Sequence, residues 1–321
     1  MSGSRVMITG GTGSLGRAFI RFALDQLACA SVVVYSRDEL KQHTLREEFR
    51  HDPRIEWVIG DVRDGQRLRS AMREVEHVVH AAALKHVSVA ERHCIEYIRT
   101  NVLGTQNVID AALENGVSRV IGVSTDKASS PVNLYGASKL CADKLFVAAN
   151  EDAGSRATRF SVVRYGNVIG SRGSVVPRFK QLAATGQPIP ITDKRMTRFW
   201  ISLDEAVRFI TDSFDLMTGG EIFVPRIPSM RVIDLAEAIA PGSPIHEIGI
   251  LPGEKLHEEM ISESEARRTV RLGERYVVRS AISGRSGAAS GTAVPDGFSY
   301  TSDTNDMWLS VADLRSRHVE V

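Results

Sequence analysis

The chain has 321 residues, of which 43% are hydrophobic and 25% charged, and its 40 basic and 39 acidic side chains leave a net charge of +1. This near-balance excludes a nucleic-acid binder that depends on bulk positive charge. No apolar run reaches the ~20 residues of a membrane span and no signal peptide is recognisable, so we expect a soluble cytoplasmic protein without nucleic-acid or membrane partners.

Short apolar runs alternate with longer amphipathic segments through the first half of the chain. The runs predict buried strands at residues 6–8, 32–35, 55–59, 78–82 and 119–124, and the segments between them predict helices at 17–26, 38–50 and 100–115. A further helix at 135–150 and a strand at 160–165 continue the alternation. Units of this length predict an α/β fold, a doubly wound parallel sheet with helices on both faces.

The alternation stops after Gly170, where prolines separate short helices such as residues 203–216 and 232–239. We therefore predict a first domain of residues 1–170 and a smaller lobe of residues 171–321, part of which returns to the first domain. Residues 283–297 are rich in Gly, Ser and Ala and predict an exposed loop.

The three cysteines, Cys29, Cys94 and Cys141, are widely spaced. Their number is odd, so at least one thiol would stay unpaired even if the other two formed a disulfide. They match neither a disulfide framework nor a metal-ligand pattern, and we predict three buried, reduced thiols and no metal site.

Three glycines, Gly10, Gly13 and Gly16, separate the first predicted strand from the first helix. Glycine at this spacing permits a tight turn, close approach of the backbone to a pyrophosphate, and packing of the helix against the strand. The N-terminus of the helix then attracts the phosphates. The pattern predicts a dinucleotide-binding Rossmann fold in which the cofactor is held by Thr9, Gly10, Gly13, Ser14, Leu15 and Gly16.

The end of the second strand indicates which dinucleotide binds. Ser36 and Arg37 stand where an NAD-binding sheet places an acidic residue, and Lys41 follows one helical turn later. A guanidinium suits the 2′-phosphate of NADP, so we predict NADP. Asp38 keeps NAD as the second choice, and solvated surface charges are the alternative for Arg37 and Lys41. The ends of the next two strands add the remaining predicted cofactor residues, Asp61, Val62, Ala81, Ala82 and Ala83.

A Tyr-x-x-x-Lys pattern places Tyr135 and Lys139 on one face of a predicted helix, and both are predicted to contact the cofactor. A lysine ammonium beside a phenol lowers the pKa of the phenol from ~10, which makes the tyrosine a usable base near neutral pH. The pattern is weak by itself, but here it follows a glycine cradle and a strand that ends at Ser124 and Thr125. Together these features predict catalysis beside a bound dinucleotide.

With these motifs the chain resembles the extended short-chain dehydrogenases/reductases. Within that family, Thr125, Asp126 and Lys127 are similar to the Thr-Asp-Lys run of the inverting UDP-N-acetylglucosamine 4,6-dehydratases of pseudaminic acid biosynthesis. The resemblance covers essentially the whole chain and includes the segments YSRDELK, HAAALKHV, NLYGASKL, ITDKRMTRFWISLDE and PGEKLHE. One departure is Leu251, because those enzymes usually carry an arginine before PGEKLHE.

The resemblance implies dehydration of a UDP-sugar with no net redox change, by a catalytic set of Thr125, Asp126, Lys127, Tyr135 and Lys139. Tyr135 takes a proton as C4 is oxidised, Asp126 protonates the departing C6 hydroxyl, and Lys127 removes the C5 proton that the C4 ketone acidifies. These roles require a raised pKa for Asp126 and a Lys127 that is neutral part of the time, helped by burial and Lys139. An exposed ion pair in a loop is the alternative for Asp126 and Lys127.

The candidates for binding the substrate are Lys85, Asn167, Arg172, Gly173, Ser174, Arg195, Arg198 and Glu254. Lys85 follows the fourth predicted strand, Asn167 follows the sixth, and Arg198 stands where the resembling enzymes bind a diphosphate. A solvated side chain is the alternative for Lys85 and Arg195, and a carboxylate at a helix N-terminus is the alternative for Glu254.

Other functions stay open at this point. A retaining 4,6-dehydratase, a 5-epimerase or a 5,6-dehydratase on a related UDP-sugar are the alternatives among enzymes, because no residue spacing shows from which face C5 is protonated. A redox sensor that keeps the NADP cradle without catalysis is the alternative of another class, although such proteins lose the tyrosine–lysine pair. The resemblance also implies a homo-oligomer, for which a hexamer is one candidate.

Overall fold

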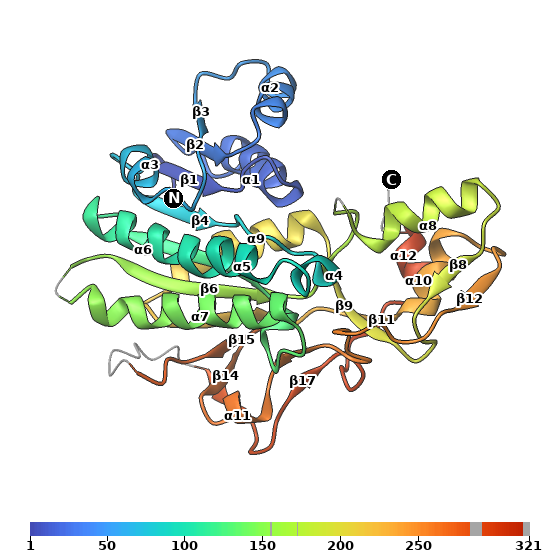
Figure 1. Cartoon of the computed structure of the whole chain (residues 1–321). Helices are drawn as coiled ribbons and strands as arrows, with labels where there is room; N and C mark the ends of the chain where they lie inside the picture. The colour runs from blue at the N-terminus through green and yellow to red at the C-terminus, as the bar shows by residue number, and fades with distance from the viewer. Residues whose placement is uncertain (155, 172, 283–290, 317–321) are drawn as a thin grey trace.

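The computed structural model describes residues 1–154, 156–171, 173–282 and 291–316 (Figure 1). At its centre is a large sheet whose parallel strands follow the order β10 (Ile222–Pro225), β6 (Arg159–Tyr165), β5 (Arg119–Thr125), β4 (His77–His80), β1 (Arg5–Thr9), β2 (Ser31–Ser36) and β3 (Ile55–Ile59). Beyond β10, the sheet continues with the antiparallel strands β15 (Arg275–Val278), β14 (Thr269–Leu272) and β16 (Thr292–Ala293). The chain order reverses between β1 and β4, so the predicted doubly wound Rossmann sheet is confirmed.

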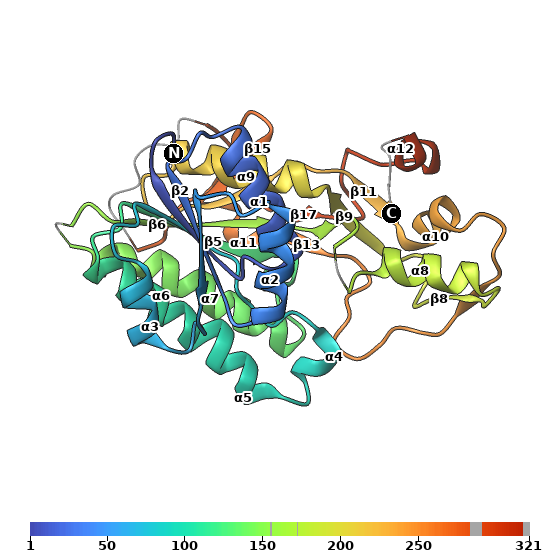
Figure 2. The same ribbon diagram turned by 90° about the horizontal axis from the view of Figure 1, so that it is seen from above.

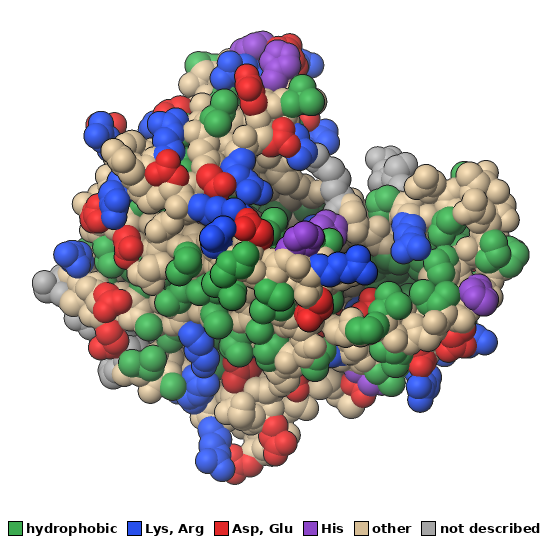
Figure 3. Space-filling view, in the orientation of Figure 1, with side chains coloured by type: hydrophobic (Ala, Val, Ile, Leu, Met, Phe, Trp, Pro, Cys, Tyr) green, Lys and Arg blue, Asp and Glu red, His purple; other side chains and the backbone are tan. Residues whose placement is uncertain are grey.

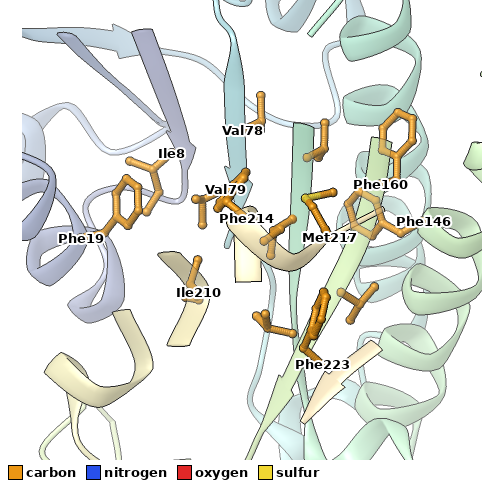
Figure 4. Packing of buried hydrophobic residues seen from close by; sticks show 14 of the residues in the cluster. Ile8, Phe19, Val78, Val79, Phe146, Phe160, Ile210, Phe214, Met217 and Phe223 are labelled. Atoms are coloured by element: carbon orange, nitrogen blue, oxygen red, sulfur yellow. The ribbon is translucent and has the colours of Figure 1, made fainter. Parts of the chain in front are cut away.

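Helices cover both faces of this sheet (Figure 2). On one face α1 (Ser14–Asp25) lies beside α9 (Leu203–Leu216), and on the other face lie α3 (Gly65–Ala71), α6 (Gly104–Glu114) and α7 (Leu134–Asp152). The helix α2 (Glu39–Glu48) connects β2 to β3. Between the layers, Phe19 of α1 lies beside Ile8, and Phe146 of α7 lies against Phe160 (Figure 4). Among the described residues, no helix combines the length and apolar character that crossing a membrane requires.

A second hydrophobic core lies to one side of the sheet, on the right of Figure 1. It is built mainly by α8 (Val175–Ala184), α10 (Val232–Ile239) and α12 (Val311–Ser316), with β8 (Ile189–Ile191) paired to β12 (Ile245–Glu247). A small sheet of β7 (Asn167–Val168), β9 (Thr197–Ile201) and β11 (Ser229–Arg231) adjoins it. The remaining short elements are α4 (Val87–Ala90), α5 (Cys94–Tyr97), β13 (Glu259–Ile261), α11 (Glu263–Ala266) and β17 (Tyr300–Thr301).

Some element boundaries differ from the sequence prediction. The strand predicted at 78–82 ends at His80, because the backbone N–H of Ala82 donates to the hydroxyl of Thr9. The helix predicted at 100–115 begins as a π-helical segment, Ile98–Leu103, and becomes α-helical at Gly104. Of the loop predicted at 283–297, residues 283–290 lie outside the described residues, whereas Thr292–Ala293 pair with β14 as an edge strand. The helices α3, α4, α5, α8, α11 and α12 are absent from the prediction. Of the three thiols expected to be buried, Cys29 is buried, whereas Cys94 and Cys141 are exposed.

A buried arginine joins three elements beneath the carboxyl end of the sheet. Arg164 of β6 is fully buried, and its guanidinium donates to Asp143 of α7 at 3.3 Å, to Glu265 of α11 at 3.0 Å and to the carbonyl of Met260 at 2.9 Å. A charge in this position needs its partners, since leaving a buried carboxylate unpaired costs several kcal/mol. Arg164 therefore ties α7 to the C-terminal part of the chain.

We expect Arg164→Met to lower the free energy of unfolding by about 3–5 kcal/mol, because the buried Asp143 and the partly buried Glu265 lose their cation. Arg231→Met is the matched control, since Arg231 forms an exposed ion pair with Asp234 and such a pair contributes at most about 1 kcal/mol. Denaturant unfolding of both variants measures the difference. Equal stability of the two variants would contradict this account of Arg164.

Candidate active site

A cavity of about 740 Å³ opens at the carboxyl ends of the parallel strands, the edge at which such sheets bind ligands. Thr9 does not line it, because this side chain is fully buried with its hydroxyl oxygen 2.8 Å from Nδ1 of His80. All other predicted cofactor residues do line it: Gly10, Gly13, Ser14, Leu15, Gly16, Ser36, Arg37, Lys41, Asp61, Val62, Ala81, Ala82, Ala83, Tyr135 and Lys139.

The loop between β1 and α1 is built so that the backbone itself forms the cavity wall. Gly10 has a φ of +68°, and a Cβ at this position would stand 2.9 Å from the backbone of Ala82. A Cβ on Gly16 would stand 2.2 Å from the carbonyl oxygen of Gly11. Gly13 is the N-cap of α1, where no side chain caps the helix and no acidic residue occupies the first turn. The positive end of the helix dipole is therefore available to an anion in the cavity.

Charged side chains line the cavity next to β2. Asp38 is the N-cap of α2: its carboxylate accepts a hydrogen bond from the backbone N–H of Lys41 at 3.0 Å and pairs with the Lys41 ammonium at 2.5 Å. The guanidinium of Arg37 is half exposed and lies 3.5 Å from Asp61. The carboxylate of Asp38 is engaged by α2. Arg37 is therefore better placed than Asp38 to contact a ligand group at the end of β2.

The strand β5 and the helix α7 bring the predicted catalytic residues together. Thr125 ends β5, and Tyr135 and Lys139 lie in the first turns of α7, which the side chain of Asn133 caps. These three side chains line the cavity, and the Thr125 side chain lies beside the Tyr135 phenol. Burial lowers the pKa of Lys139, an effect that the carboxylate of Asp143 opposes. Burial also raises the pKa of Tyr135 to about 12. The expected lowering of this pKa is wrong for the present arrangement, because lost solvation outweighs the effect of the Lys127 ammonium.

Asp126 lies behind the cavity wall in a 3₁₀ turn, η2 (Asp126–Ala128). It is fully buried, and its Oδ1 accepts hydrogen bonds from the Thr125 hydroxyl at 2.9 Å and from the Lys127 ammonium at 3.1 Å. Burial raises the pKa of Asp126, in agreement with the expectation for a group that must donate a proton. The alternative of an exposed loop ion pair is therefore wrong.

Lys127 has a second carboxylate partner that the sequence analysis missed. Oε1 of Glu258 lies 2.8 Å from the Lys127 ammonium, and the Glu258 side chain is 2% exposed. The two carboxylates raise the pKa of Lys127 against the effect of burial. The expectation of a partly neutral lysine is therefore wrong for this arrangement, which holds Lys127 as an ammonium. Glu258 ends the PGEKLHE segment, but no spacing rule links it to a lysine so distant in the sequence.

A second cavity of about 340 Å³ adjoins the first, and Lys127, Asn167 and Ser174 line both. Of the other predicted substrate residues, Gly173, Arg198 and Glu254 line the second cavity and Lys85 lines the first. The sequence analysis missed further polar side chains of the second cavity, Asn133, Arg178, Trp200 and Lys255.

One predicted substrate residue of the described ranges is not brought to these cavities. Arg195 lines neither of them, because its guanidinium makes two hydrogen bonds to Asp193, and its side chain is 73% exposed. Its alternative, a solvated side chain, is what the structure shows. Arg172 lies outside the described residues. Within the described ranges, no group of three His, Cys, Asp or Glu side chains is arranged to hold a metal ion.

Comparisons with known proteins agree with this geometry. A family model described as "Polysaccharide biosynthesis protein" matches residues 6–280. A protein of Campylobacter jejuni named UDP-N-acetylglucosamine 4,6-dehydratase (inverting) is 51% identical over 96% of this chain and 95% of its own length. A UDP-glucose 4-epimerase of Rickettsia canadensis is 39% identical over 84% of this chain and 81% of its own.

Solved structures show the same fold. The X-ray structure of Pen from Bacillus thuringiensis superposes with a TM-score of 0.92 at 37% identity and covers 99% of this chain and 98% of that one. DesIV, a dTDP-glucose 4,6-dehydratase from Streptomyces venezuelae with NAD and TYD bound, gives a TM-score of 0.70 at 26% identity over 78% of this chain and 86% of that one. The expected resemblance to the extended short-chain dehydrogenases/reductases is confirmed.

Proposed function

This chain belongs to the polysaccharide biosynthesis proteins, within the extended short-chain dehydrogenases/reductases, and we propose that it is a UDP-N-acetylglucosamine 4,6-dehydratase that inverts C5. The observation that carries the proposal is the buried pair of Asp126 and Lys127 beside Tyr135, where the two cavities meet. Loss of water from the sugar requires an acid and a base in addition to the tyrosine that acts at C4. The product would be UDP-2-acetamido-2,6-dideoxy-β-L-arabino-hex-4-ulose.

The first cavity fits a nicotinamide dinucleotide. Its glycine turn leaves no room for a Cβ at Gly10 or Gly16, and Gly13 leaves the N-terminus of α1 without a side-chain cap. When bound, the cofactor supplies the acceptor and then the donor of a hydride. Arg37 favours NADP, because a guanidinium can bind the 2′-phosphate with two hydrogen bonds and Asp38 is engaged by α2.

The residues at the junction of the cavities divide the proton transfers between them. Tyr135 takes the proton of the C4 hydroxyl, and the ammonium of Lys127 favours its phenolate. Asp126, kept protonated by burial, gives its proton to the departing C6 hydroxyl. Lys127 removes the C5 proton, which requires that it first lose the proton that Glu258 now stabilises. As C6 is reduced, a proton returns to C5 from the opposite face, and this return inverts the centre.

The second cavity is the proposed site of the UDP group. Asn167, Ser174 and Arg198 line it, and Arg198 is held by hydrogen bonds to the carbonyls of Thr197, Leu256 and Lys255. A fixed guanidinium is suited to a diphosphate. Leu251 lines the same cavity and offers only apolar contact to this ligand.

The proposal extends to assembly, compartment and pathway. Figure 3 shows hydrophobic side chains gathered on the face that α5, α6 and α7 present, and Ile95, Ile98 and Leu103 on this side of the chain are 55%, 37% and 54% exposed. Exposed apolar side chains gathered in this way favour contact with a second protein surface, which supports a homo-oligomer. A cytoplasmic location and a role in pseudaminic acid biosynthesis complete the proposal, on the strength of the resemblance.

We expect the purified protein to convert UDP-N-acetylglucosamine to the 4-keto-6-deoxy sugar with inverted C5. Proton NMR in deuterated water separates this product from that of a retaining dehydratase, a 5-epimerase or a 5,6-dehydratase. Asp126→Asn and Lys127→Ala should each lower kcat by about 100-fold or more, the usual contribution of a general acid or base, while cofactor affinity is retained. Lys194→Ala, which removes an exposed ammonium near Glu247, is the control. Near wild-type turnover in either active-site variant would remove the role assigned to it.

Arg37→Ala should weaken the binding of NADP by about tenfold or more and leave the binding of NAD nearly unchanged, since a charge-assisted contact to a phosphate is lost. Calorimetric titration of both dinucleotides measures the change. Arg46→Ala removes the same charge from the last turn of α2, outside the cavity lining, and should alter neither affinity. A wild-type protein that binds NAD more tightly than NADP would refute the preference.

A further inference from the structure

Residues 253–259 lead into β13 and contact the loop that follows Lys127. The side-chain amide of Asn133 donates to the carbonyl of Gly253 at 2.7 Å, and the ammonium of Lys255 donates to the carbonyl of Ser129 at 2.6 Å. The hydroxyl of Ser129 also donates to the carboxylate of Glu259 at 2.6 Å. This segment therefore fixes the loop that follows Lys127.

Glu258 is the member of this segment that faces the site. Its backbone is held by two hydrogen bonds to Ser302, at 2.9 Å and 2.8 Å. Its Oε1 lies 2.8 Å from the Lys127 ammonium and 3.6 Å from Nε of Arg198. Its Oε2 and the Oδ2 of Asp126 are buried without a hydrogen-bond partner in the described part of the chain. Two buried carboxylates thus share one ammonium.

We propose that Glu258 is a positioning residue for the dehydration: it holds Lys127 in place and serves as its permanent counter-charge, so that Asp126 keeps the proton that it must donate. The inference rests on the proposed function. Neither Glu258 nor its contact with Lys127 follows from the motifs around Thr125 and Tyr135.

The charges around the two carboxyl groups support the assignment of the proton to Asp126 and of the negative charge to Glu258. Burial opposes the ionisation of both carboxylates, and the negative charge of Glu258 adds to the raised pKa of Asp126. Lys127 and Arg198 lower the pKa of Glu258, which has two cations where Asp126 has one. Environments that separate two pKa values in this way assign the proton to one carboxyl and the charge to the other. The titratable and charged groups that act on Glu258, Asp126 and Lys127 from the surrounding elements are Tyr135 from α7, Arg198 from β9, and Lys255 from the segment that carries Glu258.

The substitution Glu258→Gln tests the proposal, because it keeps the size of the side chain and removes its charge. Without this negative charge the pKa of Lys127 and that of Asp126 both fall, as each loses a neighbouring anion. Both limbs of the pH profile of kcat should therefore move to lower pH, by about one unit or more, whichever of the two coupled groups governs each limb. Glu258→Asp keeps the charge and should leave the limbs near their wild-type positions.

Glu237→Gln is the matched control, since it is the same change at an exposed glutamate of α10 that pairs with Arg315 and lines neither cavity. Its pH profile should match the wild type. A Glu258→Gln profile that falls in height without moving, or that moves to higher pH, would overturn the proposal and leave Glu258 a structural role only.

A second readout does not depend on turnover. The infrared carbonyl band of protonated Asp126, identified by its loss in Asp126→Asn, should disappear at lower pH in Glu258→Gln than in the wild type. An unchanged titration of this band overturns the proposal for Glu258. Absence of product with the wild-type protein refutes the dehydratase function instead, so the two failures are distinguishable.

Discussion

Lys127 lies between the carboxylates of Asp126 and Glu258, and all three groups are largely removed from water. Charges buried in this way are tolerated only as a connected set, because an unpaired one costs several kcal/mol. Asp126 and Lys127 come from the end of β5, whereas Glu258 comes from the segment before β13. The C-terminal part of the chain must therefore return to the carboxyl end of the sheet, and this return brings the two cavities together at Lys127.

The need to keep these buried charges connected also explains how one site can hold both a proton donor and proton acceptors. Tyr135 and Lys139 project from the first turns of α7 into the cofactor cavity, while Asp126 stays behind the wall and Lys127 reaches the boundary with the second cavity. The phenol, the carboxyl and the amine are thus placed within one connected set but in different surroundings. Burial opposes every charge here, so neighbouring charges decide which groups keep their protons.

The sequence predicted those parts of the fold and of the site that depend on local patterns of residues. Strand and helix periodicity predicted the Rossmann sheet and the bounds of α9, and the glycine spacing predicted the loop at Gly10 that lines the first cavity. It failed where the cause is tertiary. The motif around Tyr135 suggested a phenol with a lowered pKa, but burial has the larger effect. Glu258 meets Lys127 only after folding, and no pattern of residue types reports such a distant contact.

The central claim is that the site moves hydrogen within a single sugar, so that oxidation at C4 and reduction at C6 cancel. The most direct test is the reaction of UDP-N-acetylglucosamine that carries deuterium at C4, with the product analysed by mass spectrometry and NMR. The account predicts a 4-keto-6-deoxy product that retains the deuterium at C6, with no accumulation of reduced dinucleotide. A product without deuterium at C6, or reduced dinucleotide formed in proportion to product, would contradict it.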